Sequence, residues 1–115
     1  MIKITEAKPD PIDLPKTKVV TIGGIATGKI EPSLHHDGQL SWHACIDPGQ
    51  ACRLSHTVWL IHGHAASPRS AVINAVIRER ALLEEKLRVL AAIEVELGTT
   101  GMTPEQMRGL EGGVA

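Results

Sequence analysis

Residues 18–32 read KVVTIGGIATGKIEP, and this stretch decides between two folds. Gly23, four further residues and Gly28-Lys29 come within one residue of the phosphate-binding P-loop, G-x-x-x-x-G-K-[ST]. A working P-loop also needs a Ser or Thr for Mg²⁺ and a helix that follows at once. Here Ile30 replaces the hydroxyl residue, and the Glu-Pro pair after it does not open a helix easily. We therefore interpret the two adjacent glycines as a hairpin turn, and the third as a bulge or a close backbone approach.

The sequence on either side extends this interpretation to a four-stranded β-meander. Further turn signals stand at Asp37-Gly38 and at residues 47–50, DPGQ, where proline presets one backbone angle and glycine accepts a positive φ. We expect strands over 17–22, 25–31, 39–46 and 51–62. Pro32 should end the second strand or place a bulge in it, because proline has no N–H to donate to a ladder.

A tight turn at 47–50 predicts the register of the last hairpin. Cys45 would face Cys52, His43 would face Leu54, and Ser41 would face His56, all on one face of the sheet. The other face would carry side chains such as Trp42. Both faces then contain many apolar side chains, so we expect one to pack on a helix and the other on a second copy of the chain.

A long helix follows, over residues 68–97. Ser67 suits the N-cap, Pro68 the first helical position and Gly98 the left-handed residue just past the end. Apolar residues recur at heptad spacing along it, interrupted by Arg80 and Glu94. These two residues can meet between antiparallel copies, so we expect self-association through the 68–97 helix and a sheet face. The alternative is a long amphipathic helix that lies on its own sheet.

The remainder of the chain adds little to this α+β architecture. Thr103-Pro104-Glu105-Gln106 is a capping box that predicts a short C-terminal helix. Residues 1–16 carry three prolines and read as an extended arm, which leaves 17–115 as a single α+β domain. The formal net charge is −1 and no apolar run suits a secretory signal or a membrane span, so neither nucleic acid nor membrane is indicated as a partner. We expect a cytoplasmic protein whose cysteines stay reduced.

The first candidate site is a loose anion site. Backbone amides of the glycine-rich stretch and several basic side chains are the groups that would bind a small anionic ligand, such as a nucleotide signal. The residues are Gly23, Gly24, Gly28, Lys29, His35, His36 and Arg53.

The second candidate site is a metal site. The predicted register brings His43, Cys45, Cys52 and His56 to one face, and such ligands suit tetrahedral Zn²⁺. The spacing matches no standard zinc module. The expectation is therefore two small reduced cysteines with histidines at the sheet edge, no bound metal and no cofactor, with a cross-strand disulfide as a further alternative.

No catalytic motif surrounds any serine, cysteine or histidine of the chain. The sequence therefore favours a small homo-oligomeric binding module, of the bacterial or phage accessory or regulatory type, which binds a small anionic ligand or a protein partner. Two alternatives stay open: a zinc-structured adaptor and a small histidine-dependent hydrolase.

Overall fold

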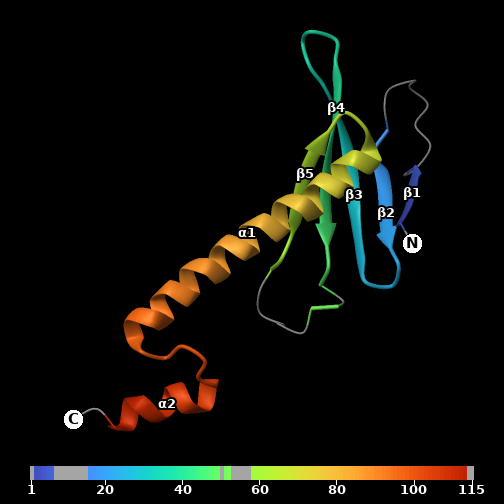
Figure 1. The fold of residues 1–115 in the computed structure, drawn as a ribbon. Coiled ribbons are helices and arrows are strands. Elements are labelled where there is room, and N and C mark those ends of the chain that lie inside the picture. Colours follow the sequence, from blue (N-terminus) through green and yellow to red (C-terminus); the bar gives the residue numbers. More distant parts are fainter. Residues whose placement is uncertain (1, 7–15, 50, 53–57, 114–115) are drawn as a thin grey trace. The chain divides into compact units, whose positions relative to one another are not determined.

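The computed structural model describes residues 2–6, 16–49, 51–52 and 58–113. An antiparallel sheet of five strands in the order β1-β2-β3-β4-β5 precedes two helices (Figure 1). The strands are β1 Ile2–Glu6, β2 Lys18–Ile22, β3 Ala26–Leu34, β4 Leu40–Asp47 and β5 Ile61–Ala65, and the helices are α1 Pro68–Leu97 and α2 Pro104–Gly113. The α+β class with one long and one short helix is confirmed.

The expectation of four strands is wrong, because the predicted N-terminal arm contributes β1. This strand pairs with β2 through contacts such as Ile4 opposite Val20. Ile2 and Ile4 alternate with polar residues, and both pack against the buried core. This alternation is a strand signal. The prediction gave more weight to the prolines farther along the arm and therefore missed the strand.

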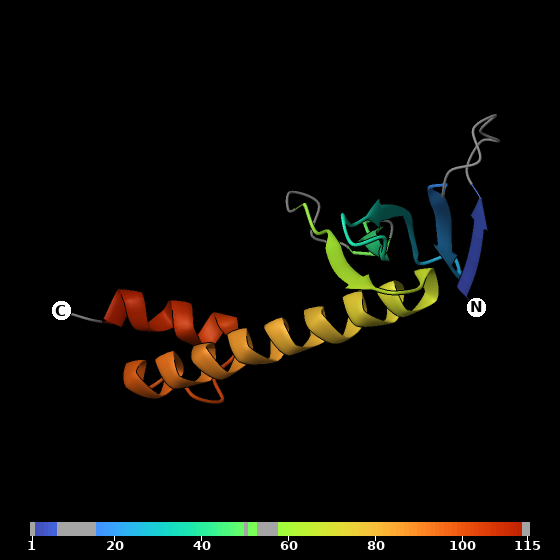
Figure 2. The same ribbon diagram turned by 90° about the horizontal axis from the view of Figure 1, so that it is seen from above.

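The chain divides after Arg80 into two compact units. In the first unit, the start of α1 lies across one face of the sheet (Figure 2). Ala71, Val72 and Ala75 of the helix are fully or almost fully buried there. The sheet side of this core consists of Val20, Ala26, Ile30, Trp42, Ala44, Ile46 and Ile61.

Gly63 of β5 allows the helix to come this close. A Cβ atom at this position would lie 2.3 Å from the Ala75 nitrogen and 2.5 Å from the Ala71 oxygen. No real Cβ tolerates such distances, so any side chain here would push α1 away from the sheet. Small residues on both sides of the contact therefore fix the distance between helix and sheet.

The predicted last hairpin is wrong in both extent and register. The fourth predicted strand, 51–62, is replaced by β5 at Ile61–Ala65, and Cys45 lies opposite His62 instead of Cys52. Asp47 Oδ1 accepts a hydrogen bond from the Gly49 nitrogen at 2.7 Å, and the Pro48 carbonyl accepts one from the Ala51 nitrogen at 3.0 Å. These bonds form turns after β4, so the chain does not continue directly into a paired strand. Leu54 and His56, the other predicted partners, lie outside the described residues.

Two further strand expectations need correction. β3 continues through Pro32, which pairs with Trp42, and ends at Leu34. β2 begins at Lys18, opposite Ile30, so no described strand borders β3 on that side at Pro32 and no ladder bond is lost there. The turn between β2 and β3 has three residues, Gly23–Ile25, instead of two, with Gly23 at a φ of 54°.

The second unit contains the rest of α1 and all of α2. Gly98 ends α1 at a φ of 72°, and the Thr99 nitrogen donates to the Glu94 carbonyl at 2.9 Å, as in a Schellman motif. The predicted capping box opens α2: Thr103 Oγ1 accepts from the Gln106 nitrogen at 3.2 Å, and Gln106 Oε1 accepts from the Thr103 nitrogen at 2.9 Å. No helix in the described part of the chain combines the length and apolar character that crossing a membrane requires.

Candidate functional site

The face of the sheet turned away from α1 carries a group of polar side chains. Strand alternation sends the even-numbered residues of β4 into the core and the odd-numbered ones to this open face. The β3–β4–β5 register then sets two rows across the sheet, Lys29–Cys45–His62 and Glu31–His43–His64. We call these six residues the histidine patch.

The open face also corrects the expectation of a sheet that is apolar on both sides. Ser41, His43 and Cys45 share one face of β4, as alternation predicts. Their neighbours on β5, however, are His62 and His64 instead of the expected Cys52 and Leu54. The sheet therefore has one apolar face, under α1, and one polar face, which is the usual arrangement for an antiparallel sheet.

Three imidazole rings meet within the patch. The His43 ring stacks on that of His64, with centroids 4.5 Å apart and planes 15° from parallel. It also lies 5.2 Å from the His62 ring at 8°. His43 Nε2 and His62 Nδ1 are 3.1 Å apart, within hydrogen-bond distance, so one ring donates an N–H to the other.

The surroundings of His43 lower its pKa from the ordinary value. Desolvation is the largest cause that lowers the pKa of His43, and the neighbouring His64 and His62 lower it further, since like charges repel. Glu31 acts in the opposite direction and raises the pKa. The lowered pKa of His43 favours its neutral form, in which one ring nitrogen has a lone pair to donate.

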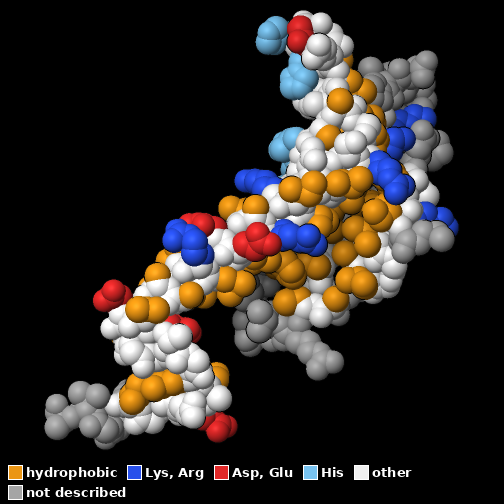
Figure 3. Space-filling model, viewed as in Figure 1, with side chains coloured by type: hydrophobic (Ala, Val, Ile, Leu, Met, Phe, Trp, Pro, Cys, Tyr) orange, Lys and Arg blue, Asp and Glu red, His pale blue; other side chains and the backbone are white. Residues whose placement is uncertain are grey.

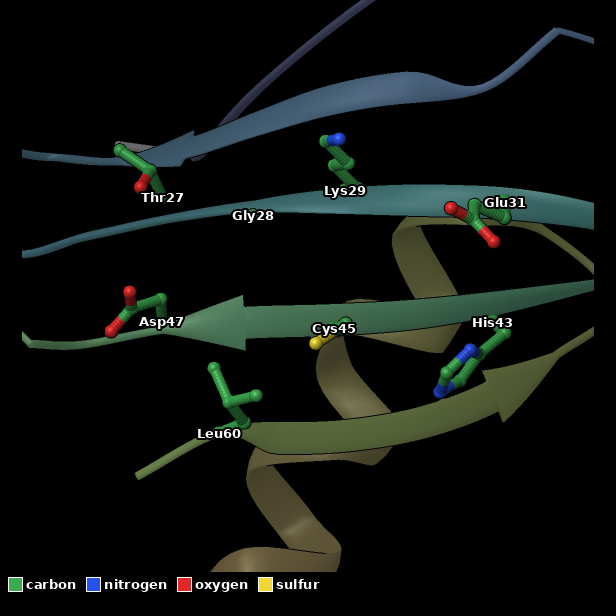
Figure 4. Close-up of a pocket in the computed structure, with 8 residues that line it drawn as sticks. All are labelled: Thr27, Gly28, Lys29, Glu31, His43, Cys45, Asp47 and Leu60. Carbon is green, nitrogen blue, oxygen red and sulfur yellow. The ribbon is translucent and has the colours of Figure 1, made fainter. Parts of the chain in front are cut away.

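A shallow pocket of about 330 Å³ opens beside the imidazoles (Figure 4). Figure 4 looks onto the open face, with α1 behind the sheet. The lining combines a cation, two carboxylates, an imidazole and a thiol, and consists of Thr27, Gly28, Lys29, Glu31, His43, Cys45, Asp47 and Leu60. Both acidic and basic groups are therefore available to a ligand at this position.

The structure does not bring the predicted anion-site residues together. Gly23 and Gly24 lie in the β2–β3 turn, whereas His35 and His36 lie at the other end of β3, in the β3–β4 turn. His35 Nε2 is 2.8 Å from Ser41 Oγ, which ties that ring to its own hairpin. Of the predicted set, Gly28 and Lys29 line the pocket, and Arg53 lies outside the described residues.

The P-loop alternative is excluded by the position of Gly28-Lys29. Both residues lie within β3, and the chain after them continues as a strand to Leu34 instead of beginning a helix. Ile30, at the position of the Mg²⁺-binding hydroxyl, is fully buried in the core. A Cβ at Gly28 would lie 2.3 Å from the Cys45 carbonyl oxygen, so the expected close backbone approach is confirmed.

The structure brings two residues of the conditional metal set to one face of the sheet. His43 and Cys45 share the open face, but Cys52 lies beyond β4 in the connection to β5 and His56 lies outside the described residues. His62 and His64 take the places opposite Cys45 and His43. The signal for them was the sequence HGH at 62–64, because histidines two apart on a strand share a face.

As the side chains stand, no three His, Cys, Asp or Glu groups among the described residues surround one point as metal ligands do. Both cysteines are free thiols. In comparisons with family models, curated proteins and solved structures, nothing matches the chain significantly.

Proposed function

We propose that this chain is a homo-oligomeric binding module whose C-terminal helices assemble copies and whose open sheet face binds a small ligand or a partner. The role would be accessory or regulatory, in the cytoplasm. The observation that carries the proposal is the apolar surface of the second unit.

In the second unit, α1 buries almost none of its apolar side chains. Leu87 is 65% exposed, Leu90 54% and Leu97 67%. Among the described residues of this unit, the exposed large apolar side chains are Leu82, Leu83, Leu87, Val89, Leu90, Ile93, Val95, Leu97 and Leu110. Figure 3 shows such side chains, in orange, on the surface of this segment. A contiguous apolar surface of this kind marks an interaction site, and a helix this exposed is only marginally stable alone.

The spacing of these residues favours a second copy as the occupant. Leu83, Leu90 and Leu97 follow one another at seven-residue intervals, and Leu87 and Glu94 occupy the second seam position. Such a seam is self-complementary when two helices run antiparallel. Arg80 of one copy is then available to Glu94 of the other, which compensates the two charges in an otherwise apolar seam.

A groove in the same unit gives the partner a place to insert. It has a volume of about 500 Å³ and is lined mostly by apolar side chains. The lining residues are Leu90, Ile93, Glu94, Leu97, Thr99, Met107 and Leu110. The Thr99 hydroxyl beside the groove is buried and has no hydrogen-bond partner among the described residues.

The test is the mass of the chain in solution, measured by light scattering over micromolar concentrations. We expect at least twice the chain mass of 12.3 kDa. Leu83→Glu should give monomers, because burying an unpaired carboxylate costs several kcal/mol. The matched control is Ala92→Glu, about two and a half helical turns away on the opposite side of α1, which should leave the assembly intact. A wild-type chain that is monomeric over this range would disprove the proposal.

A further inference from the structure

The three imidazoles of the histidine patch form an arrangement that the assembly proposal does not use. His43 Nε2 and His62 Nδ1 face each other at 3.1 Å. Two nitrogens bound to one tetrahedral zinc ion, each at 2.0–2.1 Å, lie about 3.3–3.4 Å apart. The pair is therefore separated by nearly the distance that a shared metal ion requires.

The surrounding groups supply further donors of the matching kind. His64 stacks on His43 with ring centroids 4.5 Å apart, and a change of its side-chain rotamer turns a third nitrogen toward the pair. Cys45 lies directly opposite His62 in the β4–β5 register, and Glu31 directly opposite His43 in the β3–β4 register. First-row divalent metals such as Zn²⁺ bind imidazole nitrogens, and thiolate and carboxylate groups are also among their ligands.

The position of the group distinguishes it from histidines that serve packing. His43 is part-buried and His64 is exposed, so these rings lie on the open face and outside the hydrophobic core beneath α1. The first two rings satisfy each other through one shared proton when no metal is bound. When a metal ion binds, the ring that carried this proton takes its other tautomer, with the proton on its second ring nitrogen, and both facing nitrogens become ligands.

We propose that His43, His62 and His64 bind one divalent transition-metal ion, with Zn²⁺ as the reference ion. Two of the nitrogens are already adjacent, and the third ring joins them by a rotamer change. The site is on the sheet unit and does not depend on assembly of the helices. Its failure and the failure of the oligomer proposal are therefore separate results.

The first experiment is a titration of the metal-free full-length chain with Zn²⁺, by calorimetry and native mass spectrometry. We expect one ion per chain. His43→Ala and His62→Ala should each weaken binding at least tenfold. The matched control is His36→Ala, which removes an exposed imidazole from the β3–β4 turn and should leave the affinity unchanged. Equal affinity in His43→Ala and the wild type would overturn the proposal, and so would loss of binding in His36→Ala.

A second measurement keeps the test decisive if a variant folds poorly. In the wild-type chain, the imidazole NMR signals of His43, His62 and His64 should shift when one equivalent of Zn²⁺ is added, whereas those of His36 should not. Co²⁺ in place of Zn²⁺ should give the intense visible absorption of a tetrahedral site. Cys45→Ser should remove any sulfur-to-metal charge-transfer band without abolishing binding. Unchanged imidazole signals at saturating Zn²⁺ would contradict the site.

Discussion

Gly63 allows the two layers of the first unit to pack closely, because the backbone of β5 meets α1 at this residue. The residues across the contact are Ala71 and Ala75, both fully buried. These three small residues are closely packed against one another. The helix therefore cannot move outward without opening the core that contains Val72 and Ile61. The same glycine lies between His62 and His64, and strand alternation places both imidazoles on the open face.

Gly63→Ala should lower the stability of the first unit by about 1–3 kcal/mol, the usual cost of overpacking a closed contact. The added methyl group would lie 2.3 Å from the Ala75 nitrogen, and backbone atoms cannot yield as a flexible side chain does. Chemical denaturation measures the loss. Gly24→Ala is the matched control, since nothing lies within 4 Å of a Cβ there, and it should change stability by much less. Equal stability of the two variants would contradict the packing argument.

At the scale of elements, local signals in the sequence predicted the helices well. Ser67 Oγ accepts from the Ser70 nitrogen at 3.3 Å, as an N-cap should, and Gly98 ends α1 in the left-handed region. The capping box at Thr103 also forms as predicted. These signals are readable because each depends on side-chain and backbone groups within a few residues of one another.

The strands were harder to predict, because pairing depends on contacts far apart in the chain. The turn signal at residues 47–50 is real, yet Asp47 caps the Gly49 nitrogen and the chain returns to the sheet only at Ile61. An error in the length of that connection changes every partner of β4 on the β5 side. For this reason the sequence placed His43 and Cys45 on the correct face but missed His62 and His64, which complete the patch.

The capping box gives a prediction at this scale. Thr103→Ala should cost about 1 kcal/mol of the stability of α2, because the Gln106 nitrogen then loses its side-chain acceptor. Amide hydrogen exchange in the first turn of α2 should speed up, while exchange in β3 and β4 should not change. The measurement also has an internal control in the N-cap of α1 at Ser67, whose turn should be unaffected. Unchanged exchange at Gln106 would show that the box does not stabilise α2.

At the scale of the whole molecule, the two units differ in how much apolar surface they leave exposed. The sheet buries its apolar face under α1 and leaves polar groups on the other side. The second unit leaves most of its large apolar side chains exposed. This difference supports the proposal that the helices self-associate and that the sheet binds a ligand.

If the helices are stable only when assembled, thermal stability must depend on protein concentration. A tenfold rise in concentration adds about 1.4 kcal/mol per association step, which should raise the Tm of the helical signal by a few degrees. Circular dichroism in the far ultraviolet, repeated at several concentrations, measures this shift. In Leu83→Glu the Tm should be lower and independent of concentration, whereas Ala92→Glu should keep the wild-type dependence. A wild-type Tm that stays constant over a hundredfold range would mean that the exposed leucines are not covered by a second copy, and the assembly proposal would then be wrong.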